Sequence, residues 1–153
     1  MTRILGISGS LRKASLNTAV LRAAEGVLED GSLKVVTLHG IPLYDGDLED
    51  ADGIPDAVTR LKEEIIASDG LIIATPEYNN AMPGVLKNAI DWLSRPPSDS
   101  GRVFAGRPVA IVGATPGGMG TVLAQDSLLP VLRALSMRPW FGGRVMLSRA
   151  SKL

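Results

Sequence analysis

Short apolar runs alternate along this chain with segments of helical periodicity, and no other feature of the sequence restricts the possible folds as strongly. Residues 70–74 and 108–113 are apolar throughout instead of at every second position. A strand shows this pattern when both of its faces are covered, as in a parallel sheet between two layers of helices. The alternation therefore predicts a doubly wound α/β fold in which the crossovers between strands are right-handed.

This alternation predicts both the strands and the helices of the fold. The strands are expected at 3–8, 33–38, 70–74, 108–113 and 144–147. The helices are expected at 17–29, 55–68, 83–93 and 121–135, and Pro130 is expected to kink or split the last of them. The polar, proline-rich residues 95–101 are expected to form a surface loop, and the acidic residues between 45 and 52 a solvated loop.

Length and composition exclude several classes of protein. The 153 residues suit a single domain, and a hydrophobic content of 45% is enough to fill its core. A net charge of zero argues against a nucleic-acid partner, because such an interface needs an excess of Lys and Arg. The absence of cysteine excludes disulfides, zinc–thiolate sites and cysteine nucleophiles. No signal peptide or apolar run of membrane-spanning length is visible, so we expect a cytoplasmic protein without a membrane partner.

Three loops of unusual composition follow expected strands, at 9–17, 75–82 and 114–120. In an open parallel sheet, ligands bind beyond the carboxyl ends of the strands, where the strand order reverses. We therefore expect these three loops to meet at one edge of the sheet and to form the binding site.

The first loop has the features of an anion site. It lies between a strand and the start of a helix, where free backbone N–H groups and the helix dipole favour negative charge. Ser10, Arg12, Ser15 and Asn17 add hydroxyl, guanidinium and amide groups at this point. The loop has neither the Walker pattern nor the dinucleotide pattern of glycines. Helix capping by Ser15 or Asn17 is the simpler alternative, but it leaves the clustering of these side chains unexplained.

The second and third loops are suited to a flat ligand. Two prolines, Pro76 and Pro83, stiffen the second loop, and its irregular backbone needs hydrogen-bond partners that a heterocycle with amide-like edges could supply. A rigid turn before the next helix is the alternative. The third loop is rich in glycine, which lets backbone approach a ligand closely, although this signal is weak by itself.

Two segments carry a resemblance to a known family. Residues 9–17 and 75–95 are similar to the two signature segments of the NAD(P)H-dependent FMN reductase family, and residues 41–49 are similar to the segment that follows its second strand. The resemblance implies a flavodoxin-like fold, with a five-stranded parallel sheet of order 2-1-3-4-5 and helices on both faces. It also implies FMN as cofactor, NAD(P)H as cosubstrate and reduction of a quinone, chromate, azo or free-flavin acceptor.

Site residues follow from the resemblance by position. Around the FMN phosphate it places Ser10, Arg12, Ser15, Leu16 and Asn17. Along the isoalloxazine ring, mainly through backbone, it places Pro76, Glu77, Tyr78 and Asn79. On the other side of the ring it places Ala114, Thr115, Gly117 and Gly118. Because the chemistry lies on FMN, no residue is required as an acid, base, nucleophile or metal ligand.

The resemblance also bears on assembly and on the end of the chain. In this family the segment matching 41–49 lies near the flavin site of a partner subunit, which implies a homodimer or homotetramer. A flavodoxin-like domain normally ends with a helix after the fifth strand, whereas this sequence stops at Leu153. Either a C-terminal helix is missing, or one face of the sheet is less covered than in the family.

Two other kinds of protein share such a fold. A flavodoxin-type electron carrier binds FMN without turning over NAD(P)H, but such carriers are strongly acidic and this chain is neutral. A phospho-ligand or signalling module is the other alternative. A receiver domain needs an aspartate where Thr75 stands, and a low-molecular-weight phosphatase needs a cysteine. The visible spectrum of the purified protein, before and after NADPH is added, separates these possibilities.

Overall fold

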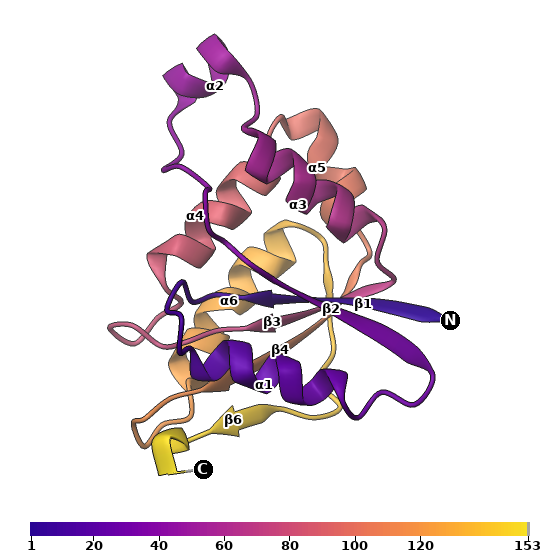
Figure 1. Cartoon of the computed structure of the whole chain (residues 1–153). Helices are drawn as coiled ribbons and strands as arrows, with labels where there is room; N and C mark the ends of the chain where they lie inside the picture. The colour runs from indigo at the N-terminus through magenta and orange to yellow at the C-terminus, as the bar shows by residue number, and fades with distance from the viewer. Residues whose placement is uncertain (153) are drawn as a thin grey trace.

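The computed structural model describes residues 1–152 and contains a parallel β-sheet with helices on both faces (Figure 1). The strand order is β2-β1-β3-β4-β5, with β6 paired to β4, so the flavodoxin-like order predicted from the sequence is confirmed. The strands are β1 (Thr2–Ser8), β2 (Gly31–Thr37), β3 (Gly70–Ala74), β4 (Pro108–Ala114), β5 (Arg138–Pro139) and β6 (Val145–Leu147).

Two short strands share the fifth position of the sheet. β5 pairs with the beginning of β4 at Pro108 and Val109, whereas β6 pairs with its end, from Val112 to Ala114. The residues between them leave the sheet after Trp140, whose N–H still donates to the carbonyl of Val109. The sequence predicted only the second piece, because two residues of strand are too few to produce a hydrophobic pattern.

The helices form two layers (Figure 1). α1 (Leu16–Glu25) lies against one face of the sheet, while α3 (Asp56–Ile66), α4 (Gly84–Leu93), α5 (Pro97–Phe104) and α6 (Val122–Ala134) lie on the other. α2 (Gly46–Asp52) projects from the end of α3 and buries none of its residues. A 3-10 turn at Ala150–Lys152 follows β6.

Two helices differ from the sequence prediction, one in its end and the other in its continuity. α1 stops at Glu25, four residues before the predicted end at 29, because Gly26 follows it and glycine is a poor helix former. α6 runs unbroken from Val122 to Ala134 with Pro130 inside it, so the predicted split does not occur.

Two segments predicted as loops contain helices. α5 begins at Pro97, inside the predicted loop 95–101, because proline suits the first turn of a helix, where its missing N–H costs nothing. The acidic segment forms α2, whose start is capped by the Asp45 carboxylate accepting from Asp47 N–H at 2.9 Å. Proline-rich and acidic composition therefore gave the wrong prediction in both places.

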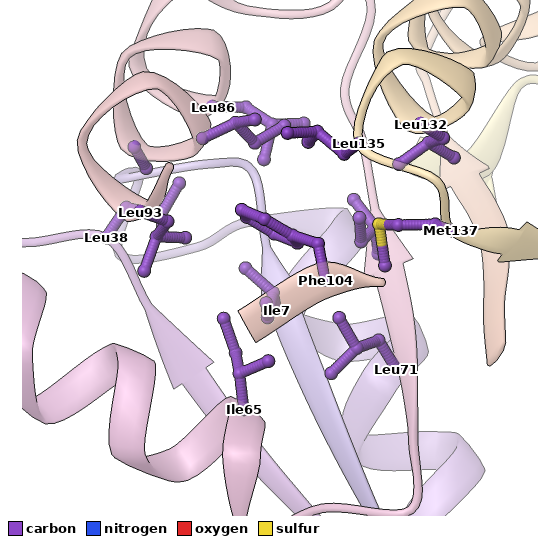
Figure 2. A pocket seen from close by; sticks show the side chains of 13 residues that line it. Ile7, Leu38, Ile65, Leu71, Leu86, Leu93, Phe104, Leu132, Leu135 and Met137 are labelled. Carbon is purple, nitrogen blue, oxygen red and sulfur yellow. The ribbon is translucent and has the colours of Figure 1, made fainter. Parts of the chain in front are cut away.

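The main core lies between the sheet and the layer of α3 to α6. Figure 2 shows Phe104 of α5 pointing into the space between Ile7, Ile65, Leu71 and the leucines of α4 and α6. The cavity left there is about 10 Å³ and entirely apolar. A space of this size and character holds no ordered water, so this is a packed core and not a ligand site.

Candidate functional site

The three loops identified in the sequence meet at the carboxyl edge of the sheet. They leave β1, β3 and β4, which are neighbours in the centre of the sheet. The strand order reverses at β1, because β2 lies on one side of it and β3 on the other. Backbone hydrogen bonds continue past the strands, from Gly9 N to Ala74 O at 2.8 Å and from Thr75 N to Val112 O at 2.9 Å. These bonds hold the loop starts side by side, which is the arrangement expected of a ligand site in this fold.

A cleft of about 120 Å³ opens between the loops. Its lining includes most of the residues predicted from the sequence, namely Ser10, Arg12, Ser15, Leu16, Asn17, Pro76, Glu77, Tyr78, Ala114 and Thr115. Three predicted residues, Asn79, Gly117 and Gly118, are exposed and do not line it. Ala14 and Pro116 line it without having been predicted, and no property of their side chains could have indicated them.

The first loop presents unused hydrogen-bond donors at the start of α1. Ser15 is the N-cap, and its hydroxyl accepts from Thr18 N at 3.2 Å. Within residues 1–152, the N–H groups of Leu16 and Asn17 have no hydrogen-bond acceptor, and the Arg12 guanidinium has neither a hydrogen bond nor an ion pair. Two free N–H groups, the helix dipole and a cation form a donor set that suits a phosphate group.

Asn17 ties the first loop to the third. Its Nδ2 donates to the carbonyl of Ala114 at 2.9 Å, and its Oδ1 accepts from Ala114 N, also at 2.9 Å. The side chain is only 3% exposed. Both ends of the Asn17 amide are therefore engaged by protein backbone, and the residue offers a ligand chiefly its main-chain N–H.

The second loop is closed by a tight turn. Tyr78 and Ala81 exchange two backbone hydrogen bonds, at 3.0 and 3.1 Å. Asn79 and Asn80 between them have φ values of 51° and 62°, a region that asparagine tolerates better than most residues. The turn leaves Tyr78 half exposed at the lip of the cleft.

The Glu77 side chain is held by α6. Its Oε2 accepts from Leu123 N at 2.9 Å and from Ala124 N at 3.0 Å. The N–H of Glu77 itself and that of Asn79 have no acceptor within the described residues 1–152. The loop thus keeps backbone donors free while its carboxylate is occupied.

The third loop is held by the last part of the described chain. Thr115 N donates to Leu147 O at 2.9 Å, and Ala150 N donates to Thr115 O at 3.0 Å. Arg149 N reaches Gly117 O at 2.8 Å. β6 and the 3-10 turn therefore fix the position of this side of the cleft.

A close approach between β4 and the start of α6 requires glycine at 113. A Cβ at Gly113 would lie 1.9 Å from the Thr121 hydroxyl and 2.7 Å from the carbonyl of Thr75. Any side chain there would push the second and third loops apart. This requirement was not recognised in the sequence, where Gly113 reads simply as the last residue of a strand.

The donor set fits FMN and gives no indication of a metal. The start of α1 suits the phosphate, and the free N–H groups of Glu77 and Asn79 suit the carbonyl and ring-nitrogen edge of an isoalloxazine.

Within residues 1–152, no group of three His, Cys, Asp or Glu side chains is arranged to hold a metal ion. No helix in the same range is both long and apolar enough to cross a membrane.

Comparisons with known proteins agree with this geometry. The family model described as NADPH-dependent FMN reductase matches residues 2–152. An NAD(P)H-dependent FMN reductase of Pseudomonas aeruginosa is 49% identical over 149 residues, which cover 97% of this chain and 78% of that protein. A 2-hydroxy-1,4-benzoquinone reductase of a Burkholderia species is 43% identical over 136 residues, covering 88% of this chain and 72% of that protein.

The fold has a similar solved structure. FerB, a flavoenzyme NAD(P)H:(acceptor) oxidoreductase from Paracoccus denitrificans, has a TM-score of 0.84 and 34% sequence identity to this chain. The alignment covers 96% of this chain and 79% of FerB. Sequence and structure thus agree over nearly all of the described residues, and the chain belongs to the NADPH-dependent FMN reductase family.

Proposed function

We propose that the cleft holds FMN, with the phosphate at the start of α1. This proposal rests on the N–H groups of Leu16 and Asn17 and on the neighbouring Arg12 guanidinium, none of which has a partner within residues 1–152. The Ser10 and Ser15 hydroxyls line the same end of the cleft and can add hydrogen bonds. A helix N-terminus and one guanidinium together balance most of the charge of a phosphate monoester.

The isoalloxazine would lie between the second and third loops. Pro76, Glu77 and Tyr78 would face it mainly through backbone, with Asn79 on the exposed turn next to Tyr78. The N–H groups of Glu77 and Asn79, which have no acceptor within residues 1–152, would stabilise negative charge on the ring. Ala114 and Thr115 would bound its other side, and Gly117 and Gly118 lie in the exposed part of the same loop. The half-exposed Tyr78 ring leaves an apolar surface beside the cofactor where a planar substrate can pack.

The reaction class is that of an NAD(P)H-dependent oxidoreductase. Bound FMN supplies hydride acceptance from NAD(P)H and electron delivery to a second substrate. The protein binds and orients both substrates, so no acid, base or nucleophile from the chain is needed. Relatives named as quinone reductases, including one from Escherichia coli that is 40% identical, favour a quinone over chromate or an azo compound as the acceptor.

The 41–49 segment is the proposed contact with a second subunit. Its backbone is fixed to α4, because Asn88 Nδ2 and Trp92 Nε1 both donate to Pro42 O, at 2.8 and 2.9 Å. Leu43 next to it is 81% exposed. A rigid loop with an exposed leucine suits a homodimer or homotetramer interface.

Because NAD(P)H is an intracellular cosubstrate, the proposed compartment is the cytoplasm.

An anaerobic titration tests the proposed reaction. The purified protein is loaded with FMN, its absorbance near 450 nm is recorded, and NADPH and then a benzoquinone are added without oxygen. We expect NADPH to bleach the flavin band and the quinone to restore it. Flavin bands that NADPH leaves unchanged would contradict the proposal and favour the electron carrier, an alternative that none of the comparisons supports. Failure to bind FMN would contradict both.

A further inference from the structure

The helix α6 begins without a cap of its own. Its N-cap residue, Thr121, has a φ of 65° and makes no side-chain hydrogen bond to the first turn. The Thr121 hydroxyl instead accepts from Gln125 Nε2 at 3.2 Å. The first N–H groups of a helix have no partner within the helix, so α6 needs an acceptor from elsewhere in the chain.

Glu77 provides that acceptor from the second loop. One carboxylate oxygen, Oε2, receives both Leu123 N and Ala124 N, at 2.9 and 3.0 Å. The negative charge lies at the positive end of the helix dipole, which strengthens these bonds. The contact joins residues that are 46 and 47 positions apart in the sequence.

A second contact holds the other end of the same loop. Met82 N donates to the Ser127 hydroxyl at 2.9 Å, and Ser127 lies one turn further along α6. Hydrogen bonds to α6 therefore fix the chain on both sides of the tight turn from Tyr78 to Ala81. Because α6 is packed into the core through Leu128 and Leu132, it forms a rigid support for the loop.

We propose that Glu77 is a positioning residue, whose carboxylate latches the second loop onto α6 so that the backbone of 76–79 is aligned for the flavin ring. Its side chain does this without touching the cofactor. The inference rests on the proposed function, since the alignment matters only if FMN binds here. It adds a role for the side chain to the one that the family resemblance gives to Glu77, which is contact with the ring mainly through backbone.

Three substitutions at this position separate the possible roles. Glu77→Gln keeps an oxygen where Oε2 lies, so the two N–H groups retain their acceptor although the charge is lost. Glu77→Asp keeps the charge but is one methylene too short to reach α6. Glu77→Ala removes the acceptor entirely. Glu29→Ala is the matched control, because Glu29 is an exposed carboxylate with no hydrogen bond or ion pair within residues 1–152.

Amide hydrogen exchange in the FMN-free protein tests the latch itself. We expect the amides of Leu123 and Ala124 to exchange roughly tenfold faster in Glu77→Ala and Glu77→Asp, a loss typical of removing a helix cap. In Glu77→Gln and in the control, exchange should stay within about threefold of the original protein, because the acceptor remains. Unchanged protection in both Glu77→Ala and Glu77→Asp would overturn the inference.

FMN affinity, measured by quenching of flavin fluorescence, tests the effect on the site. We expect Kd to rise about tenfold in Glu77→Asp and Glu77→Ala and to stay within about threefold in Glu77→Gln. If FMN bound more tightly to Glu77→Asp than to Glu77→Gln, the inference would be overturned. The role would then depend on the charge of the side chain and not on its length. A fall in melting temperature with unchanged Kd would also overturn it, since a merely structural role predicts that result. If Glu77→Ala does not fold, the comparison of Gln with Asp decides.

The two proposals can fail separately. If the unmodified protein binds no FMN, the proposed function fails even when the exchange data support the latch. If FMN binds and NADPH reduces it, but Glu77→Asp and Glu77→Gln behave alike in both measurements, only the role of Glu77 fails.

Discussion

At the scale of single residues, the side chains of the site are of two kinds. Some are available to bond a ligand, and others are already hydrogen-bonded to another part of the protein. The Arg12 guanidinium makes no hydrogen bond or ion pair within residues 1–152, so it is available to a ligand. Asn17 and Glu77 also line the cleft, but the Asn17 side-chain amide is bonded to Ala114 and Glu77 Oε2 to the start of α6. Residues that line a cleft can therefore act either by touching the ligand or by holding the walls in place.

Arg12→Ala is expected to weaken FMN binding by more than tenfold. A charge-assisted hydrogen bond to phosphate contributes about 1.5–3 kcal/mol, and alanine removes the charge as well as the donors. Lys13→Ala is the matched control, because Lys13 is the adjacent cation and does not line the cleft. The measurement is a fluorescence titration with FMN, and equal affinities for the original protein and Arg12→Ala would contradict the role given to Arg12.

At the scale of elements, one buried cation joins α3 to α5. Lys62 of α3 has a side chain that is only 5% exposed and bonds to Asp99 Oδ2 at 2.9 Å as well as to the carbonyl of Arg95. Arg102 adds a bond of 2.7 Å to the same aspartate. Hydrogen bonds from Arg102 and then from Lys62 lower the pKa of Asp99 to about 2. This contact holds in place the helix that carries Phe104 into the core.

Asp99→Asn is expected to destabilise the protein by about 2 kcal/mol at pH 7, because it leaves the buried Lys62 ammonium without its counter-charge. Arg102→Gln removes an exposed partner of Asp99 and should cost less than about 1 kcal/mol. Urea unfolding of both variants measures the difference, and equal losses would contradict this ranking.

The same pair predicts a pH dependence. Asp99 has a lower pKa in the folded than in the unfolded chain, so its contribution is complete above the ordinary value of 3.8 and is lost as pH falls toward about 2. The stability gap between the original protein and Asp99→Asn should therefore shrink between pH 4 and about 2. A gap that stays constant over this range would show that the charge of Asp99 is not what stabilises α5.

Elements also show where sequence reasoning succeeds and where it fails. β3 was predicted at its observed bounds, because a run of five apolar residues between polar segments has one interpretation in a parallel sheet. α5 was missed because Pro97 and the serines around it are typical of loops, although Val103 and Phe104 at its end are buried. The two pieces of the fifth strand depend on pairing with β4, which no local pattern reveals.

At the scale of the whole molecule, the positions of the three loops were predictable and their connections were not. The alternation of strands and helices and the composition of the loops can be read in the sequence, and the family resemblance implies the strand order. Together they predict the edge where Ser10, Pro76 and Ala114 meet. The bonds from Asn17 to Ala114 and from Glu77 to α6 join distant parts of the chain through tertiary packing. They could be found only in the folded structure.

The proposed assembly gives a prediction at this scale. Leu43→Glu places a charge on the exposed side chain that would be buried between subunits, and we expect the complex to dissociate into single chains at micromolar concentration. Val27→Glu is the matched control, since Val27 is 76% exposed at the far end of α1. Light scattering coupled to gel filtration reports the mass. A single-chain mass for the original protein, or a Leu43→Glu variant that stays associated, would contradict the proposed interface.

A comparison of FMN with riboflavin tests whether the start of α1 binds the phosphate of FMN. Riboflavin has the same ring system without the phosphate, so the contacts at the phosphate end of the cleft, chiefly those of Leu16, Asn17 and Arg12, distinguish the two ligands. We expect FMN to bind roughly a hundredfold more tightly, equivalent to about 2.7 kcal/mol of phosphate contacts. Similar Kd values for the two flavins in fluorescence titrations would show that the start of α1 does not bind the phosphate.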